Sequence, residues 1–176
     1  LFYATLGMPV AFLADRINRR NIIAIAVAVW SLMTALGGFA IGFWTLAAAR
    51  IGGGVGEAGA SPPAHSMIAD LYPEKERAGA LGIYSLGIYF GVMIGFLVGA
   101  YVAQYYGWRA AFFVVGLPGL IIAVLVRYTM IEPQRGAADG LEPQEPEPID
   151  WSQMWVEILA GFKHLLSDPV SRNVIF

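Results

Sequence analysis

Two charged side chains interrupt an apolar stretch of the sequence at a spacing that suits chemistry inside a membrane. Arg50 and Glu57 are seven residues apart, so a helix would place them on nearly the same face, about 10 Å apart along its axis. Gly54 and Ser61 share that face. A charge in the bilayer interior costs about 2.5–3.5 kcal/mol on insertion scales and is therefore a functional candidate. We interpret Glu57 as a carboxylate in an aqueous cavity that takes up and releases protons; a structural ion pair between helices is the alternative.

The same stretch contains a G-x-G-x-x-G pattern at Gly54, Gly56 and Gly59, a spacing typical of dinucleotide-binding loops. Such a loop needs a preceding strand and a helix that continues beyond it. Here an apolar helical run precedes the glycines, and Pro62 and Pro63 follow them. Because small residues let helices approach closely in lipid, we interpret the glycines of this pattern, Gly54 among them, as helix-packing positions. The chain has no cysteine, and we predict no metal and no cofactor.

The elements that hold these residues are predicted to be membrane-spanning helices. The chain is 57% hydrophobic and only 14% charged, with a mean hydropathy of +0.61. About 20 mainly apolar residues cross a bilayer as a helix. Four segments with at most one charge satisfy this requirement: 22–49, 51–69, 78–108 and 110–131. The sequence therefore predicts an all-α, polytopic membrane protein whose surroundings are the lipid bilayer, without a nucleic-acid partner.

The distribution of basic residues predicts the orientation of these helices. With the turn at 15–21 placed inside, only Arg109 lies in an outside turn. The inside segments hold Arg16, Arg19, Arg20, Lys75, Arg77, Arg127, Arg135, Lys163 and Arg172. This asymmetry follows the positive-inside rule and suits a bacterial inner (plasma) membrane.

Four regions follow from composition. We predict a transmembrane bundle over 1–131 and an acidic, proline-rich cytoplasmic linker over 132–150. Residues 151–167 have apolar side chains at helical spacing, which fits either an amphipathic helix in the membrane interface or a helix packed on the protein. Residues 168–176 begin another apolar run. We therefore expect the chain to be an internal piece of a longer protein.

Glycines recur along the span that begins near residue 79. Gly87, Gly91, Gly95 and Gly99 are four residues apart and form a ridge on one helix face, with Gly82 below it. Small residues permit close helix contact. The ridge therefore indicates either static packing or a smooth surface along which a neighbouring helix slides.

Several motifs, in order, resemble the N-terminal half of a major facilitator superfamily transporter. "AFLADRINRR" at 11–20 is similar to the signature between helices two and three, and "LAAARIGGGVGEA" at 46–58 to the fourth-helix pattern. "GIYSLGIYFGVMIGFLVGA" at 82–100 resembles the fifth-helix antiporter pattern, although Phe96 and Ala100 depart from it. "GWRAAF" at 107–112 resembles the turn before helix six. "DRINRR" and "GVGEA" are most similar to the Spinster family.

The resemblance implies twelve helices in two halves that rock around a central site, in a protein that acts as a monomer. It implies that Arg50 and Glu57 couple protons and face the substrate; the shared helix face adds Ser61 to this predicted cavity. It also implies cytoplasmic charges that latch the halves together. These gating charges are Asp15, Arg16, Arg19, Arg20, Asp70 and Arg77.

Together these features predict a secondary active transporter, with proton coupling, for a small amphiphile, lysolipid or organic anion. An organic-acid or sugar-phosphate permease of the same fold is one alternative, and a non-transporting membrane scaffold or sensor is another. Ser66, His65 and Asp70 raise the possibility of an intramembrane hydrolase. We disfavour an enzyme because a nucleophile and its base rarely act from adjacent positions of one helix.

Overall fold

The computed structural model describes residues 9–14, 16–140, 156 and 160. Its helices are α2 (Arg19–Gly37), α3 (Phe43–Leu71), α4 (Glu74–Tyr106), α5 (Trp108–Thr129) and the 3-10 turn η1 (Ala137–Asp139). A helical segment over 9–14 precedes α2, and no strand forms among the described residues. The all-α prediction is confirmed. The predicted regions 151–167 and 168–176 lie outside the described residues, apart from 156 and 160.

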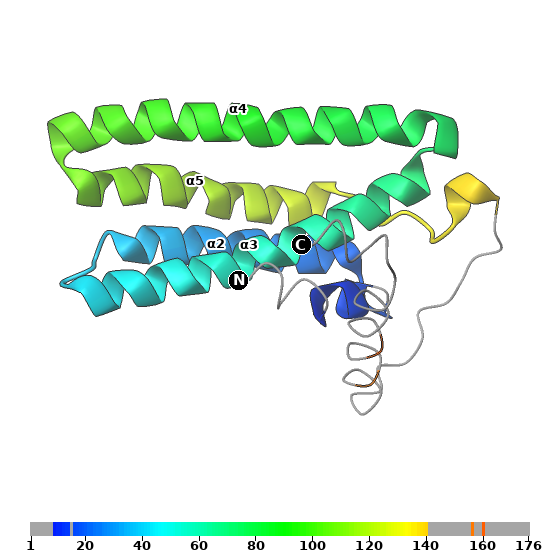
Figure 1. Cartoon of the computed structure of the whole chain (residues 1–176), viewed down its shortest axis with the longest axis horizontal. Helices are drawn as coiled ribbons and strands as arrows, with labels where there is room; N and C mark the ends of the chain where they lie inside the picture. Colours follow the sequence, from blue (N-terminus) through cyan, green and yellow to red (C-terminus); the bar gives the residue numbers. More distant parts are fainter. Residues whose placement is uncertain (1–8, 15, 141–155, 157–159, 161–176) are drawn as a thin grey trace.

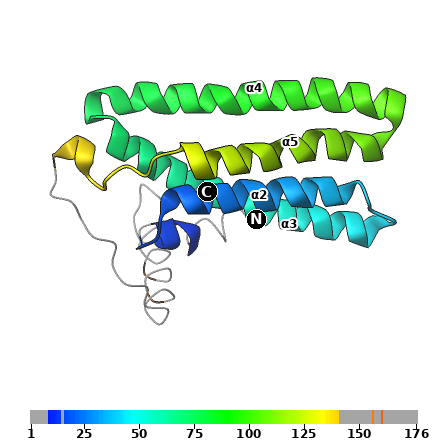
Figure 2. The same ribbon diagram turned by 180° about the vertical axis from the view of Figure 1, so that it is seen from behind.

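The four long helices run side by side, and consecutive helices are antiparallel (Figures 1 and 2). Helix α2 packs against both α3 and α5, and α4 packs against α5. Helices α3 and α4 follow one another in the chain but make far fewer contacts with each other. One face of α3 is therefore left open toward α4.

Local sequence signals set where these helices begin and end. The Asn18 side chain accepts a hydrogen bond from the Asn21 amide at 3.0 Å and caps α2. The Thr45 hydroxyl accepts from the Gly42 amide at 3.1 Å at the start of α3. Gly107, at φ 85°, lies in the positive-φ region that favours glycine, and it joins α4 to α5 with no other residue between them.

Helices α2, α4 and α5 are each long and apolar enough to cross a membrane. Helix α3 has 29 residues but does not meet the same criterion, because glycines and the charges at Arg50 and Glu57 lower its hydropathy. It stays helical through Pro62 and Pro63, which confirms the helical reading of the glycine-rich stretch. Beyond these prolines it climbs away from α2 toward the start of α4 (Figure 1).

Two glycines bring helix backbones into close contact: Gly56, which belongs to the predicted glycine pattern, and Gly116, which was not predicted. A Cβ atom on Gly56 of α3 would lie 2.6 Å from the Trp30 amide nitrogen of α2. A Cβ on Gly116 of α5 would lie 2.7 Å from the Ala35 nitrogen of α2. Backbone atoms cannot give way as side-chain ends can, so these two glycines allow α3 and α5 to pack directly on α2.

The predicted ridge on α4 has no partner within the described part of the chain. A Cβ at Gly82, Gly87, Gly91 or Gly95 would meet no described atom within 4 Å, and one at Gly99 would meet only Val115, at 3.9 Å. Gly54 is partly buried on α3. The packing role of the ridge remains a prediction about helices outside this chain.

Candidate functional site

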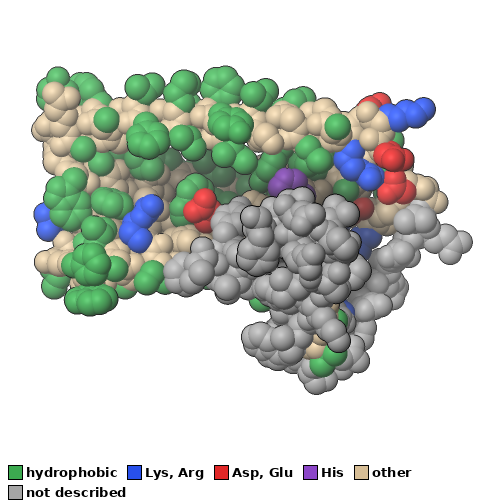
Figure 3. All heavy atoms as spheres, viewed as in Figure 1, with side chains coloured by type: hydrophobic (Ala, Val, Ile, Leu, Met, Phe, Trp, Pro, Cys, Tyr) green, Lys and Arg blue, Asp and Glu red, His purple; other side chains and the backbone are tan. Residues whose placement is uncertain are grey.

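Arg50 and Glu57 both lie on the exposed surface of α3. Neither makes a hydrogen bond or an ion pair with any described residue. Figure 3 shows a basic, an acidic and a histidine side chain following one another along the face between α3 and α4. Partly buried Ser61 comes four residues after Glu57.

The separation of the two charges decides what they can do. Seven residues of helix place their backbones about 10 Å apart along the axis, and no direct bridge joins the side chains. The described residues therefore offer Arg50 and Glu57 as two separate points of contact. A molecule with an anionic group and a protonatable or hydrogen-bonding group could meet both, whereas the alternative of a structural ion pair has no partner in this part of the chain.

His65 continues this face toward the end of α3. Its Nδ1 lies 2.9 Å from the carbonyl oxygen of Ser61. Its ring packs edge-on against Tyr84 of α4, with 5.3 Å between the ring centroids. His65 is thus placed where α3 and α4 come together, although its side chain stays exposed.

A second polar centre surrounds Arg19, whose side chain is only 1% exposed. Its Nε donates to Glu132 Oε1 at 2.8 Å, and its Nη1 donates to Ser66 Oγ at 2.8 Å and to the Asp70 carboxylate. Its Nη2 donates to the Pro133 carbonyl at 3.0 Å. We call Arg19, Asp70 and Glu132 the Arg19 network; it joins the start of α2, the end of α3 and the segment after α5.

Further contacts attach the segment after α5 to the same end of the bundle. Arg77 Nη2 lies 3.0 and 3.1 Å from the Asp139 carboxylate oxygens and donates to the Ala69 carbonyl at 2.8 Å. Arg135 donates to the carbonyls of Ala14 and Ile17 at 2.7 and 3.1 Å. The first residues of the predicted linker therefore lie against the helix ends.

The structure brings together only some of the predicted gating charges. Arg19 pairs with Asp70, whereas Arg16 lies over the Phe12 ring, 3.7 Å from its centroid. The Arg20 amide donates to Glu132 Oε2 at 2.9 Å. Asp15 lies outside the described residues.

Sequence reasoning missed Glu132, Arg135 and Asp139 because the average composition of 132–150 suggested an unattached linker. One signal was available: Glu132 is the first acid after the last apolar span, at the end where the basic residues gather. Ser66 Oγ accepts a hydrogen bond from Arg19, which gives this serine a structural role.

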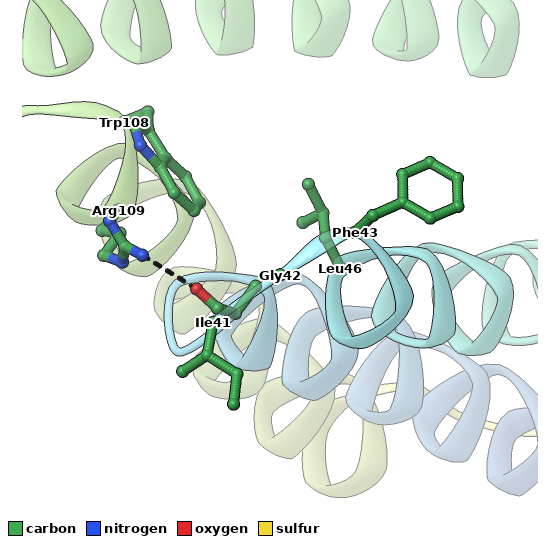
Figure 4. A pocket seen from close by; sticks show the side chains of 7 residues that line it. Ile41, Gly42, Phe43, Leu46, Trp108 and Arg109 are labelled. Atoms are coloured by element: carbon green, nitrogen blue, oxygen red, sulfur yellow. Dashed lines mark hydrogen bonds between the residues drawn. The ribbon is translucent and has the colours of Figure 1, made fainter.

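The opposite end of the bundle carries a shallow hollow (Figure 4). It is lined by Ala40, Ile41, Gly42, Phe43, Leu46, Trp108 and Arg109. The Arg109 guanidinium lies 4.2 Å from the Trp108 ring centroid and donates to the Ala40 carbonyl at 2.9 Å. Arg109 thus ties the α2–α3 connection to the start of α5, at the end away from the Arg19 network.

Comparison with known proteins agrees with this arrangement. The model of the Major Facilitator Superfamily matches residues 1–175. The chain belongs to the major facilitator superfamily. It is 34% identical to an MFS-type efflux pump of Mycolicibacterium smegmatis, in a match that covers 96% of this chain and 37% of the pump. It is 35% identical to protein spinster homolog 1 of Homo sapiens, in a match that covers 90% of this chain and 30% of that protein.

A solved structure extends the match from sequence to fold. A bacterial homologue of the human lysosomal transporter Spinster, in an inward-facing and occupied conformation, is 40% identical with a TM-score of 0.69. The match covers 79% of this chain and 36% of that one. The predicted membership of the superfamily and likeness to Spinster are confirmed, and the chain spans about a third of its relatives' length.

Membership of the major facilitator superfamily settles two further predictions. The chain is part of an integral, multi-pass membrane protein, and the bacterial relatives agree with an inner-membrane location. The superfamily consists of transporters, so the chain does not belong to an enzyme. Ser66 and His65 accordingly need an explanation other than hydrolysis.

Proposed function

We propose that this chain forms part of a proton-coupled secondary transporter that moves a small amphiphile, lysolipid or organic anion by alternating access. The observation that carries the proposal is the pair of charges Arg50 and Glu57 on the open face of α3, neither of which has a partner in the described part of the chain. A carboxylate without an ion-pair partner can gain and lose a proton without first breaking a salt bridge. Charges on intramembrane helices are costly and therefore favour a functional role.

Each group on this face has a distinct proposed role. Glu57 carries the proton, and its change of charge alters how well the cavity holds an anion. Arg50 attracts the anionic group of the substrate because a guanidinium can bind a carboxylate or phosphate through two parallel hydrogen bonds. Ser61 contributes a hydroxyl one helical turn beyond Glu57.

The gating charges are proposed to bias the exchange between inward and outward states. Exposed ion pairs at helix ends are worth little individually, but a near-balanced equilibrium responds to small differences. The Arg19 network joins groups of this chain to one another and so favours a role in holding this half rigid. Asp15, Arg16, Arg20 and Arg77 remain the proposed contacts to the other half, and Arg77 would have to exchange its bridge to Asp139 for such a contact.

A permease for organic acids is the second candidate, and one relative favours it. The probable galactarate/D-glucarate transporter of Bacillus subtilis is 31% identical over 135 residues, covering 73% of this chain and 30% of that protein. A sugar diacid would also place an anionic group at Arg50. The two candidates differ in the apolar part of the substrate, which only an amphiphile has.

The proposal is tested with the complete transporter in lipid vesicles. Uptake of radiolabelled lysophosphatidylglycerol and of radiolabelled D-glucarate is measured with and without an imposed proton gradient. We expect one probe to accumulate with the gradient, and Glu57→Gln to abolish accumulation, while Glu74→Gln, which removes an exposed acid at the start of α4, does not.

Two outcomes would contradict the proposal. If Glu57→Gln leaves the rate and its pH dependence intact, Glu57 does not couple protons. If the wild-type protein neither binds nor moves either probe, a scaffold or sensor role gains support.

A further inference from the structure

His65 is a protonatable side chain on the same helix as Glu57 to which the proposed transport mechanism gives no role. It lies eight residues beyond Glu57 toward the end of α3 that carries the Arg19 network, which is about 12 Å along the helix axis. Its side chain is exposed, whereas a histidine that only fills the core would be buried. The ring is nonetheless held in place by its edge-on contact with Tyr84 of α4.

The hydrogen bond at Nδ1 fixes which ring nitrogen can accept a proton. Nδ1 lies 2.9 Å from the Ser61 carbonyl oxygen, and a carbonyl can only accept a hydrogen bond. Nδ1 therefore carries the hydrogen, and the neutral ring keeps its lone pair on Nε2. No described residue forms a hydrogen bond with Nε2. The histidine is thus anchored through one nitrogen and offers the other to its surroundings.

The groups around His65 do not hold a fixed charge against it. Helix α4 presents the Tyr84 ring and, one turn beyond His65, the Arg77 guanidinium, whose charge is paired with Asp139. The next acid along α3, Asp70, is occupied by Arg19 and by the Gly136 amide, which donates to Asp70 Oδ1 at 2.9 Å. The only charged side chains of α2, Arg19 and Arg20, lie at its first turn. Glu57 is therefore the acid on this face of α3 that has no partner among the described residues.

We propose that His65 is a second proton carrier of the transport pathway, placed between Glu57 and the cytoplasm. This inference rests on the proposed proton coupling through Glu57. A proton leaves the Glu57 carboxyl, crosses to Nε2 of His65 through intervening water, and leaves a carboxylate and an imidazolium. Nε2 then gives the proton to cytoplasmic water, and the ring returns to its neutral form. Imidazole suits this step because it changes charge between about pH 5 and 8.

The first test observes His65 directly and does not require transport. The complete transporter is labelled with ¹⁵N-histidine, and His65→Asn identifies the His65 signals by their loss. We expect an Nδ1–H tautomer for the neutral ring, uptake of a proton at Nε2 as the pH falls, and a change of the Nε2 signal in Glu57→Gln. A ring that never takes up a proton at Nε2, or whose Nε2 signal is unchanged in Glu57→Gln, overturns the inference.

The second test asks whether the proton step depends on the imidazole. His65→Phe keeps a ring against Tyr84, His65→Asn keeps a donor for the Ser61 carbonyl, and neither carries a proton. We expect both to flatten the pH profile of lysophosphatidylglycerol or D-glucarate uptake between about pH 5 and 8 without lowering Tm. Tyr84→Phe, which keeps the ring contact, should retain the wild-type profile.

The outcomes separate this inference from the proposed function. If both His65 variants keep the wild-type pH profile while Glu57→Gln abolishes accumulation, only the role of His65 is wrong. If Glu57→Gln also transports normally, the proposed coupling fails and the inference fails with it.

Discussion

Nε of Arg19 lies 2.8 Å from Oε1 of Glu132, although the two residues are 113 positions apart in the sequence. The same guanidinium also binds Ser66 and Asp70 and is almost completely shielded from solvent. Two carboxylates and several hydrogen bonds offset the cost of burying this cation. The beginning of α2 is therefore joined to the end of α3 and to the segment after α5.

Replacement of Arg19 by alanine should destabilise this half of the protein strongly. The variant leaves Asp70 and Glu132 facing one another without their cation. Removing one partner of a buried pair costs about 3–5 kcal/mol, and we expect the lower end of that range because the two acid side chains keep some exposure, 15% and 23%. Thermal unfolding of the purified transporter should show a clear drop in Tm. Lys75→Ala, at an exposed position of α4, is the control, and equal Tm values for the two variants would contradict the prediction.

Replacement of Arg77 by alanine should have a much smaller effect. Its bridge to Asp139 joins side chains that are 26% and 47% exposed, and exposed pairs contribute about 0–1 kcal/mol. A double-mutant cycle with Asp139→Ala should give a coupling energy in that range that falls as salt increases. A coupling energy as large as that between Arg19 and Asp70 would contradict the prediction that the exposed Arg77–Asp139 bridge contributes little to stability.

Gly56→Ala should destabilise the packing of α3 on α2. The added Cβ would lie 2.6 Å from the Trp30 nitrogen and 2.8 Å from the Ala26 oxygen, so the helices must separate, at a cost of about 1–3 kcal/mol. Gly53→Ala is a matched control because its Cβ would lie 3.7 Å from Cδ1 of Trp30, an ordinary van der Waals contact. We expect a lower Tm for Gly56→Ala alone, and similar values for both variants would count against close packing at Gly56.

Arg50→Gln should weaken substrate binding more than it slows transport at saturation. A hydrogen bond to a charged group is worth about 1.5–3 kcal/mol, so loss of the guanidinium should raise KM for the transported anion by about 10- to 100-fold. Lys75→Gln removes a basic residue away from this face and should leave KM unchanged. An unaltered KM in Arg50→Gln would mean that Arg50 does not contact the substrate.

Gly91→Leu should impair transport if the α4 ridge packs against helices outside this chain. No described atom lies within 4 Å of a Cβ atom at this position. The packing within this chain therefore predicts little loss of stability for Gly91→Leu. Uptake in vesicles should therefore fall in Gly91→Leu but not in Val92→Leu, the exposed neighbour on another face. Normal uptake in Gly91→Leu would show that transport does not depend on the glycine ridge.

The sequence was sufficient to predict the helices and the shared face of Arg50 and Glu57, because both depend on local spacing. Runs of apolar residues longer than a bilayer crossing allow few structures other than helices. A separation of seven residues fixes two side chains on one face wherever the helix lies. The charge distribution also placed Arg109 at the end of the bundle opposite Arg19, as found in the structure.

Contacts between distant segments were harder to predict. The partners of Arg19 come from α3 and from beyond α5, and no local pattern states that Glu132 returns to the start of α2. The close-packed glycine of α5 was missed for a related reason. The glycine pattern of α3 pointed to Gly56 and the regular spacing on α4 to Gly91 and its neighbours, whereas Gly116 stands out only once α2 is placed against it.

The distance in sequence between Arg19 and its partners sets an order of events during synthesis. Asp70 is made 51 residues after Arg19, and Glu132 is made 113 residues after it. At about 5–20 residues per second, Arg19 waits roughly 3–10 s for the first carboxylate and roughly 6–23 s for the second. Until then the guanidinium lacks the two carboxylates that compensate its burial, and the start of α2 cannot reach the packing seen here. The Arg19 network can therefore close only after α5 has been made.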